Sequence, residues 1–544
     1  MNPLSSCVRL LFLLLAFSAS AQTIDPTAGA MIFRKGILPD GQALRGEREA
    51  NVSVEGAAAA CVNCHRHSGL GAAEGQTVIA PITGKYLFRP NGQQAEDMDF
   101  RYLQRFNLAR DPYPDEAGVA RAIREGVGRG DRQLNYLMPR FKLNDESMAS
   151  LIAYLKTLSK DVSPGVSGDT LHFATIITPD ADPVARRGML QVMEQFITDK
   201  NEFIRGGVRP MRASGEFMYR VSRRWQLHVW ELSGPPDTWE KQLHEHLAAE
   251  PVFAVISGLG GKTWEPVHRF CEQEAIPCLL PNVDLPVVTE SDFYPLYFSK
   301  GVVLEAQLIS HQLQQDAQAR KSQRLVQVYR QGDIGADASK ELAKSVSTGE
   351  IANVNRVLPS VKAGQSGREL ARALEGTGSG DAIMLWLRPD DLRSLPAKVP
   401  AGASVFVSGS MADLEQAPLP AAWRKVARMA YPYDLPDQRK VRMNFPLGWF
   451  KVRHIPVVAE RVQSDTYLAM GVLSEAVTHM LESFYRDYLV ERIENMLSAH
   501  QVSGYYPRFG LAPGQRFASK GGYVVHFADP DGSRLVADSE WITP

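Results

Sequence analysis

The sequence predicts two fold classes in one chain: an all-α domain, then an α/β module of two lobes, each with a doubly wound parallel sheet. Three observations predict this organisation. A Cys-x-x-Cys-His motif stands at residues 61–65, in a region whose apolar residues recur at helical spacing. A stretch rich in serine, glycine and proline follows at residues 159–169. Beyond it, short β-rich runs alternate with amphipathic helices, the pattern of parallel sheets covered on both faces.

The composition limits the classes of protein that the chain can belong to. It has 544 residues, 44% of them hydrophobic, which is enough for roughly three or four compact units with cores of their own. Sixty Lys and Arg residues against sixty-one Asp and Glu residues leave a formal net charge of −1. That balance, without any basic block, argues against a nucleic-acid partner. Five cysteines are too few for a disulfide scaffold.

The first residues have the features of an export signal. Arg9 supplies the only side-chain charge, Leu10–Phe17 is a short apolar run, and Ala19-Ser20-Ala21 offers a cleavage site of small residues. The run is shorter than the about 20 apolar residues of a membrane span. We therefore expect residues 1–21 to be removed after Ala21, with Cys7 among them. The mature protein is then expected to be periplasmic, with no membrane span.

Cys61, Cys64 and His65 carry the most specific chemistry in the sequence. Two thiols three positions apart can both add to the vinyl groups of one haem, and the adjacent imidazole then becomes an axial iron ligand. A thioredoxin-like pair would need a βαβ context, and a zinc site would need a second pair of ligands. The sequence offers neither, so we predict one covalently attached haem c.

A low-spin electron-transfer haem needs a sixth ligand, commonly a methionine sulfur. Met98, Met138 and Met148 are the methionines between the motif and residue 160. Met148 recurs with the apolar residues of 151–155 at helical spacing, which predicts a core position. Met138 opens a loop just before that helix, where its thioether is free to reach the haem iron. We expect Met138 to be the ligand, with Met98 or an open site as the alternatives.

Residues from about 25 to 160 resemble a class I cytochrome c, and we assign 22–160 to this domain. Gly29 and Phe33 resemble the family's N-terminal helix, where a glycine lets the C-terminal helix, here at 151–156, cross closely. The resemblance implies that the carbonyl of Pro81 accepts the N–H of His65. It also implies one-electron transfer with a redox partner protein, such as a cytochrome, a dehydrogenase or an oxidase.

Residues 161–169 are predicted to be a linker, and residues 170–544 the α/β module. Lobe 1 is expected at about 170–296 and 437–500, lobe 2 at about 297–436, and C-terminal strands at 501–544. One long amphipathic helix is expected through Leu473–Tyr488. The predicted strands are 171–178, 226–232, 252–257, 278–280, 325–330, 351–358, 382–387, 404–408 and 426–431, and the helices between them are 183–201, 238–249 and 264–274.

The module resembles type I periplasmic binding proteins of the branched-chain amino-acid and amide family, which serve ABC transporters. Ala254–Gly261, a helix and Ile276–Pro281 look like the third strand, ligand loop, helix and fourth strand of the first lobe. The resemblance implies a small-molecule ligand between the lobes and an ABC permease as a further partner. Candidate ligand contacts are Gly260, Gly261, Lys262 and Thr263 in lobe 1, and Tyr329, Gln331, Asp333, Trp386 and Ser408 at strand ends of lobe 2.

Departures from this family leave alternatives open. Gly261 and Lys262 replace the loop's usual hydroxyl residues, which argues against an ordinary amino-acid ligand. Lys262 also opposes the macrodipole at a helix start, so either an anionic group compensates it or water solvates it. Cys271 and Cys278 either form a local disulfide or remain two buried thiols.

Three functions are consistent with these features, and because no spaced acid–base set is present, none of them is enzymatic. The leading hypothesis is an exported monohaem cytochrome that carries single electrons, fused to a module that closes on a small organic ligand. The second is a receptor for an ABC importer, with the haem domain secondary. The third is an electron acceptor for an exported dehydrogenase, with the lobes as its docking surface.

Overall fold

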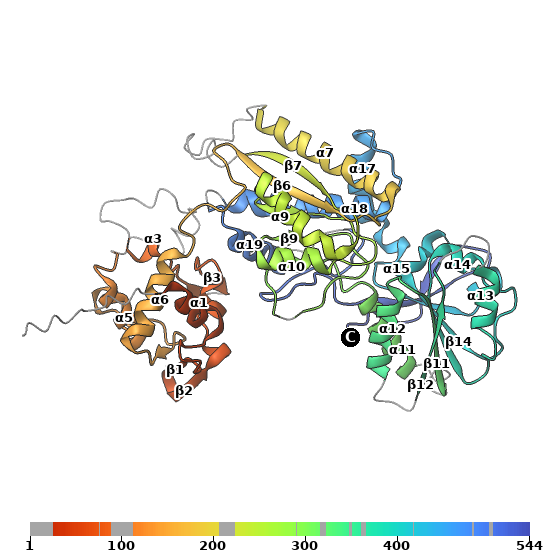
Figure 1. The fold of residues 1–544 in the computed structure, drawn as a ribbon, viewed down its shortest axis with the longest axis horizontal. Helices are drawn as coiled ribbons and strands as arrows, with labels where there is room; N and C mark the ends of the chain where they lie inside the picture. The colour runs from red at the N-terminus through yellow and green to blue at the C-terminus, as the bar shows by residue number, and fades with distance from the viewer. Residues whose placement is uncertain are drawn as a thin grey trace, which may run out of the picture. The chain divides into compact units, whose positions relative to one another are not determined.

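The computed structural model describes residues 25–74, 77–88, 112–205, 223–289, 291–315, 322–346, 351–360, 366–416, 418–480, 483–499 and 504–544. These fall into two compact units, one before and one after the boundary between Lys160 and Asp161 (Figure 1). The expected export signal and Met98 lie outside the described residues. Within the described part of the chain, no helix is long and apolar enough to cross a bilayer.

The first unit is built on the crossing of its first and last helices. These are α1 (Pro26–Lys35) and α6 (Asp145–Thr157), which begins at an Asn144 whose side chain caps the first turn. A Cβ atom placed on Gly29 of α1 would lie only 2.0 Å from the carbonyl oxygen of Ser150. The close crossing predicted at Gly29 is therefore confirmed.

Short elements complete the first unit, including two small sheets that the all-α expectation did not contain. One sheet has the strand order β2-β1-β5, and the other is the pair β3-β4. Their strands have two to four residues, too few to show an alternating pattern in the sequence. The elements are β1 (Arg45–Arg48), β2 (Val52–Glu55), α2 (Val62–His65), β3 (Ala72–Glu74), β4 (Thr77–Ile79), α3 (Gly84–Leu87), α5 (Glu116–Glu125), β5 (Arg140–Phe141) and the 3-10 turns Glu49–Asn51, Gly56–Ala59 and Arg129–Asp131.

Lobe 1 of the second unit has a five-stranded parallel sheet with the order β10-β9-β8-β6-β7. Helices α7 and α18 pack together on one face, and α9 and α10 pack together on the other (Figure 1). The elements are β6 (Thr170–Ile177), α7 (Pro183–Arg205), β7 (Arg224–Glu231), η4 (Pro236–Thr238), α9 (Trp239–Ala249), β8 (Ala254–Ile256), α10 (Glu265–Gln273), β9 (Cys278–Leu279), β10 (Pro295–Leu296), α17 (Pro436–Val452), α18 (Glu460–Met480) and α19 (Arg486–Ala499).

Lobe 2 has a seven-stranded sheet with the order β12-β11-β13-β14-β15-β16-β17. The first five strands are parallel, and the last two, which come from the C-terminal segment, join antiparallel. The elements are α11 (Val302–Gln315), β11 (Arg324–Arg330), α12 (Gly335–Val346), β12 (Ala352–Leu358), α13 (Ser366–Ala373), β13 (Asp381–Trp386), α14 (Pro389–Arg393), β14 (Ser404–Ser408), α15 (Gly409–Ala412), η6 (Leu414–Gln416), α16 (Ala421–Arg424), β15 (Ala427–Tyr431), β16 (Tyr523–Phe527) and β17 (Leu535–Ala537).

The nine predicted strands are all present, each within about two residues of its predicted bounds. The single long helix predicted through Leu473–Tyr488 is wrong, because α18 ends at Met480 and α19 begins at Arg486. Between them, the backbone bonds to the linker instead. Ser163 N donates to the carbonyl of Phe484 at 3.2 Å, and Arg486 N donates to Ser163 Oγ at 3.0 Å.

The linker itself is packed onto lobe 1 over part of its length. Gly165 has a φ of +82°, and a Cβ atom there would lie 2.0 Å from the backbone nitrogen of Phe253. Its carbonyl accepts a hydrogen bond from His172 N of β6 at 2.8 Å. Gly165 therefore lets the linker pack closely against lobe 1, in addition to connecting the two units.

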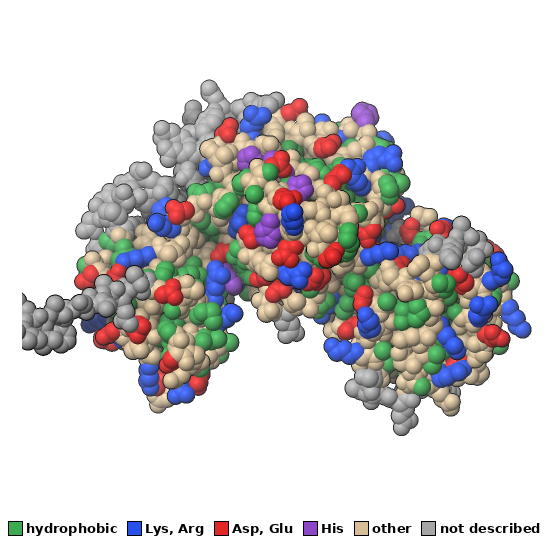
Figure 2. All heavy atoms as spheres, in the orientation of Figure 1, with side chains coloured by type: hydrophobic (Ala, Val, Ile, Leu, Met, Phe, Trp, Pro, Cys, Tyr) green, Lys and Arg blue, Asp and Glu red, His purple; other side chains and the backbone are tan. Residues whose placement is uncertain are grey.

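On the face drawn in Figure 2, acidic and basic side chains are interspersed over both units. This distribution agrees with the near-zero net charge of the sequence. It gives no support for a surface that binds nucleic acid through its phosphates.

Gly29→Ala is expected to destabilise the first unit, because the added methyl group would overlap the Ser150 carbonyl of the crossing helix. Overpacking of this kind costs about 1–3 kcal/mol. The measurement is calorimetric unfolding of the full chain. Gly448→Ala is the matched control, since no atom lies within 4 Å of a Cβ atom added there. Equal unfolding temperatures for Gly29→Ala and wild type would contradict the expectation.

Candidate functional site

The predicted haem-binding residues lie within one turn of backbone. Cys61 is the N-cap of the short helix α2, and Cys64 and His65 are its last two residues. His65 N donates to the carbonyl of Cys61 at 2.9 Å, and Arg66, with a φ of +66°, ends the helix. This turn brings two thiols and one imidazole to the same short stretch of chain, as attachment to a single haem requires.

The His65 ring is buried, and its Nδ1 atom lies 3.1 Å from the carbonyl oxygen of Ala80. A carbonyl only accepts, so Nδ1 carries the proton, and the lone pair of Nε2 is left for a metal ion. Burial lowers the pKa of His65 to about 4, although the hydrogen bond to Ala80 acts in the opposite direction. The ring is therefore neutral near pH 7, in the form that ligates iron.

The carbonyl that meets His65 belongs to Ala80, and not to Pro81 as the family resemblance implied. The register of the β3-β4 pair explains the difference. Ala72 pairs with Ile79, and Gly71 N donates to the carbonyl of His65 at 3.2 Å, so Ala80 is the residue that comes beside the imidazole. Pro81 acts indirectly, since a proline holds the preceding residue in extended backbone.

Met138 lies half-buried in the loop between Arg129–Asp131 and β5. It packs against the same apolar cluster as Cys61 and Val62. Met148 is 3% exposed inside α6, in the core position that its spacing predicted. Of the candidate methionines Met138 and Met148, only Met138 therefore lies outside a helix core.

The Cys61 thiol and the Thr83 hydroxyl have surroundings that fit a bound prosthetic group. Burial raises the pKa of the Cys61 thiol to about 12, which marks an apolar environment around the sulfur. Thr83 is 1% exposed, and its hydroxyl has no hydrogen-bond partner among the described residues. An apolar macrocycle with polar propionate groups at its edge satisfies both conditions.

Comparison with known families agrees with this geometry. Residues 55–159 match the family model of cytochrome c. The first unit is a cytochrome c domain. Domains of this family carry haem c, and the cysteines that hold it in this cytochrome domain are Cys61 and Cys64. No curated protein matches the sequence of the chain.

Solved structures identify the fold of the second unit. A fatty acid ABC transporter substrate-binding protein from Thermomonospora curvata covers 71% of this chain and 95% of its own, with 14% identity and a TM-score of 0.51. A branched-chain amino acid ABC transporter protein from Thermus thermophilus, with bound valine, covers 70% and 97%, with 12% identity and a TM-score of 0.50. At this identity the matches show the fold alone, which is that of type I periplasmic binding proteins.

In lobe 1, the loop of Gly260, Gly261, Lys262 and Thr263 is already bonded to an acid of the chain. Lys262 N donates to Asp180 Oδ2 at 2.8 Å, and Gly261 N donates to Thr178 Oγ1 at 3.3 Å. A Cβ atom on Gly261 would lie 2.7 Å from Asp180 Oδ2, so the carboxylate sits directly against this glycine. Asp180 therefore supplies an anionic group to the loop at Lys262, which lies before the first residue of α10, Glu265.

In lobe 2, the predicted ligand residues separate into two groups. Trp386 is fully buried in the core, where its Nε1 donates to Gln327 Oε1 at 2.9 Å, so it packs and presents no surface to a ligand. Tyr329 packs against the same core with part of its side chain exposed. Asp333 is the charged member of the set, and it accepts hydrogen bonds from both Arg388 Nε and Nη2 at 3.1 and 3.0 Å.

Asp333 belongs to an ion-pair network between the lobes that the sequence did not indicate. Asp284 lies 3.2 Å from Arg461, which like it belongs to lobe 1, and 3.7 Å from Arg388 of lobe 2. Burial favours the neutral form of Asp333, but the bonds and charge of Arg388 prevail and lower its pKa, with Lys262 adding to the effect. The only sequence signal for Arg388 is a charge directly after a buried strand.

Glu305 of α11 is a buried carboxyl group that lies against the end of β14. It accepts hydrogen bonds from Ser408 Oγ and from Ser410 N, the latter at 2.6 Å. Burial raises its pKa to about 7, against the effect of these hydrogen bonds. Asp465 in α18 is likewise buried, and its pKa is also raised to about 7.

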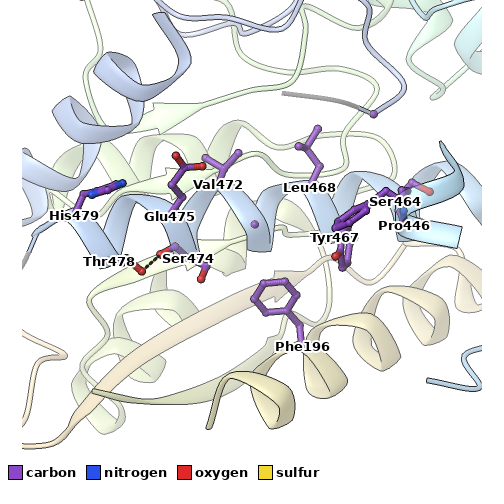
Figure 3. Close-up of a pocket in the computed structure, with 13 residues that line it drawn as sticks. Phe196, Pro446, Ser464, Tyr467, Leu468, Val472, Ser474, Glu475, Thr478 and His479 are labelled. Atoms are coloured by element: carbon purple, nitrogen blue, oxygen red, sulfur yellow. Dashed lines mark hydrogen bonds between the residues drawn. The ribbon is translucent and has the colours of Figure 1, made fainter. Parts of the chain in front are cut away.

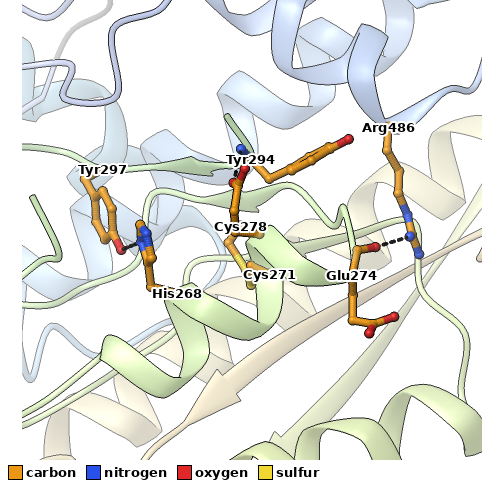
Figure 4. The surroundings of a disulfide bond; sticks show 8 residues. His268, Cys271, Glu274, Cys278, Tyr294, Tyr297 and Arg486 are labelled. Atoms are coloured by element: carbon orange, nitrogen blue, oxygen red, sulfur yellow. Dashed lines mark hydrogen bonds between the residues drawn. A yellow bond between two sulfur atoms is a disulfide. The ribbon is translucent and has the colours of Figure 1, made fainter. Parts of the chain in front are cut away.

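Cys271 and Cys278 form a disulfide between α10 and β9, with their Cα atoms 6.1 Å apart (Figure 4). Both residues are buried. Beside them, His268 Nδ1 lies 2.7 Å from the hydroxyl of Tyr297. The disulfide fixes the end of α10, whose other end follows the loop that binds Asp180.

Met138→Ala is expected to remove the absorption band of the methionine–iron bond and to lower the midpoint potential, because a thioether ligand favours the reduced iron. Optical spectra and a redox titration are the measurements. Met148→Leu is the control and is expected to leave both unchanged, with a stability loss under about 1.5 kcal/mol. Unchanged spectra in Met138→Ala would assign the sixth position elsewhere.

Glu305→Gln is expected to flatten the dependence of stability on pH. The pKa of Glu305 is about 7 in the fold and near 4.5 unfolded, so its protonation stabilises the fold fully below pH 4.5, and the contribution is lost as the pH rises through 7. The free energy of unfolding that protonation of Glu305 contributes at low pH, and that is lost at high pH, is about 3 kcal/mol at most. Denaturant unfolding at pH 5 and pH 8 measures it. The exposed Glu375→Gln should retain the wild-type dependence, and the same dependence in Glu305→Gln would be inconsistent with the shift.

Proposed function

We propose that this protein is an exported electron carrier in which a monohaem cytochrome c domain is joined to a module that binds a small organic molecule between its lobes. The observation that supports electron transfer is the turn at Cys61–His65, with Nδ1 of His65 held by the Ala80 carbonyl. Haem c bound there supplies one-electron oxidation and reduction at iron.

The residues of the cytochrome domain have separate tasks in this function. Cys61 and Cys64 hold the haem covalently, so it stays bound in both oxidation states. His65 is kept neutral and correctly oriented by burial and by Ala80. Met138 would supply a thioether as the second protein ligand of the iron. The apolar cluster around Cys61 and Met138 excludes water, which disfavours the more highly charged oxidised state and raises the potential.

The same proposal assigns the protein to the periplasm. Its support is the export-like start of the sequence, residues 1–21, together with haem attachment and the Cys271–Cys278 disulfide. The redox partner is then a protein of the same compartment.

A ligand of the amino-acid type is disfavoured by the lobe 1 loop. The similar Thermus protein holds valine. Here, however, Asp180 already occupies Lys262 N, and a second carboxylate would have to displace it. The Asp284–Arg388 ion pair likewise joins the lobes through side chains of the chain itself. These contacts argue against a receptor that binds amino acids for an importer.

The function is tested by the attachment and reduction of the haem. Exported full-length protein is expected to contain one haem per chain that acid–acetone does not extract, and to be reduced and oxidised reversibly. The double variant Cys61→Ser/Cys64→Ser should lose the covalent haem, while Cys271→Ser/Cys278→Ser should keep it. An extractable haem in the wild type would refute the proposal.

Asp180→Ala is expected to free the backbone N–H of Lys262 and to remove the acceptor of the Thr178 hydroxyl, with a loss of about 1.5 kcal/mol, the low end of the range for hydrogen bonds to a charged group. Acetate at constant ionic strength should then raise the melting temperature of the variant more than that of the wild type. Asp237→Ala, a change at another exposed acid of lobe 1, is the control. Equal stabilisation of the wild type and Asp180→Ala by acetate would show that Asp180 does not occupy the anion position.

A further inference from the structure

A pocket of about 460 Å³ opens on lobe 1 (Figure 3). Its walls come from three helices: Phe196 belongs to α7, Phe445 and Pro446 belong to α17, and most of the remaining lining residues belong to α18. The volume is in the range of small-molecule sites. None of the predicted ligand residues lines it, so it is distinct from the proposed site between the lobes.

One part of the pocket is a set of aromatic rings around Tyr467. The ring of Phe196 lies 5.9 Å from that of Tyr467, and the ring of Phe445 lies 6.1 Å from it, between centroids. Phe445 is 69% exposed, and Val441 and Val452 on the same helix are also strongly exposed. An apolar molecule seated here would bury Phe445, which water now surrounds.

The polar groups of the pocket lie along α18. Ser464 is 2% exposed, and its hydroxyl oxygen has no hydrogen-bond partner. Glu475 is exposed, and no ion pair or hydrogen bond joins it to another described residue. The two residues are eleven positions apart, or roughly 16 Å along a helix that rises 1.5 Å per residue. Figure 3 shows them on either side of Tyr467 and Val472 along the helix.

Glu475 is the one lining residue with a formal charge when His479 is neutral. A cation contacts the lining from outside: the ammonium of Lys200 donates to Ser474 Oγ at 3.0 Å and lies 5.5 Å from the centre of the Trp225 ring. Lys200 itself does not line the pocket. The lining therefore presents one unpaired negative charge beside aromatic rings.

We propose that this pocket binds a primary amine with an aromatic or aliphatic body. The ammonium group pairs with Glu475, and the body lies among Phe196, Phe445 and Tyr467. The unpartnered hydroxyl of Ser464 accepts or donates one hydrogen bond at the far end of a longer ligand. The site is independent of the proposed function of the haem and of the cleft between the lobes.

The test compares tryptamine with indole-3-propionate, two ligands of similar shape and opposite charge. Binding to the full-length holoprotein is measured by isothermal titration calorimetry, and the haem absorption spectrum is recorded at each point to detect ligation of iron by the amine. Tryptamine is expected to bind at least tenfold more tightly than indole-3-propionate. Glu475→Gln and Phe445→Ala should each weaken tryptamine binding by at least fivefold.

Both variants change exposed side chains, so their folds should be retained. Glu245→Gln, a change at an exposed acid of α9, is the matched control and should bind tryptamine like the wild type. Equal or tighter binding of indole-3-propionate would instead point to an anionic ligand near Lys200 and overturn the proposal. Absence of tryptamine binding at millimolar concentration, or wild-type binding in both variants, would overturn it as well.

Discussion

The hydrogen bond between His65 Nδ1 and the Ala80 carbonyl links the local sequence motif to the rest of the cytochrome domain. The motif alone places two thiols and an imidazole on one turn, but it does not orient the imidazole ring. That orientation depends on the β3-β4 pairing, which brings residue 80 beside residue 65. Gly71 permits the approach, since a Cβ atom there would lie 2.1 Å from the carbonyl oxygen of Ile79. A three-residue ribbon thus determines which ring nitrogen is available to iron.

In the α/β module, by contrast, acidic and basic groups of the chain itself occupy positions that the charged groups of a ligand could take. Asp180 accepts a hydrogen bond from Lys262 N in the lobe 1 loop. Asp284 pairs with Arg388 across the lobes and with Arg461 within lobe 1. The charges of these residues are therefore already paired within the chain, before any ligand is bound.

Sequence reasoning succeeded where the controlling interactions are local. Buried parallel strands are near-continuous apolar runs, so β6, β11 and β14 could be located closely. The haem motif requires only residues 61–65. It failed where a contact between residues distant in the sequence determines the structure. Ser163, which bonds to the segment between α18 and α19, is more than 300 positions from Arg486. Asp180, which bonds to the lobe 1 loop, is 82 positions from Lys262. Pro81 and Trp386 were misassigned because strand register and core packing are not visible in a single sequence.

The four cysteines of the described chain impose opposite redox demands on its assembly. Haem attachment requires Cys61 and Cys64 as reduced thiols, whereas the bond between Cys271 and Cys278 forms only by oxidation. Both pairs are close in sequence, so an oxidant able to join the second pair can also join the first. Maturation must therefore protect one thiol pair while the other is oxidised. Because the haem pair lies 210 residues nearer the start, a chain exported from its N-terminus presents it first, and early haem attachment would remove it from competition before the second pair emerges.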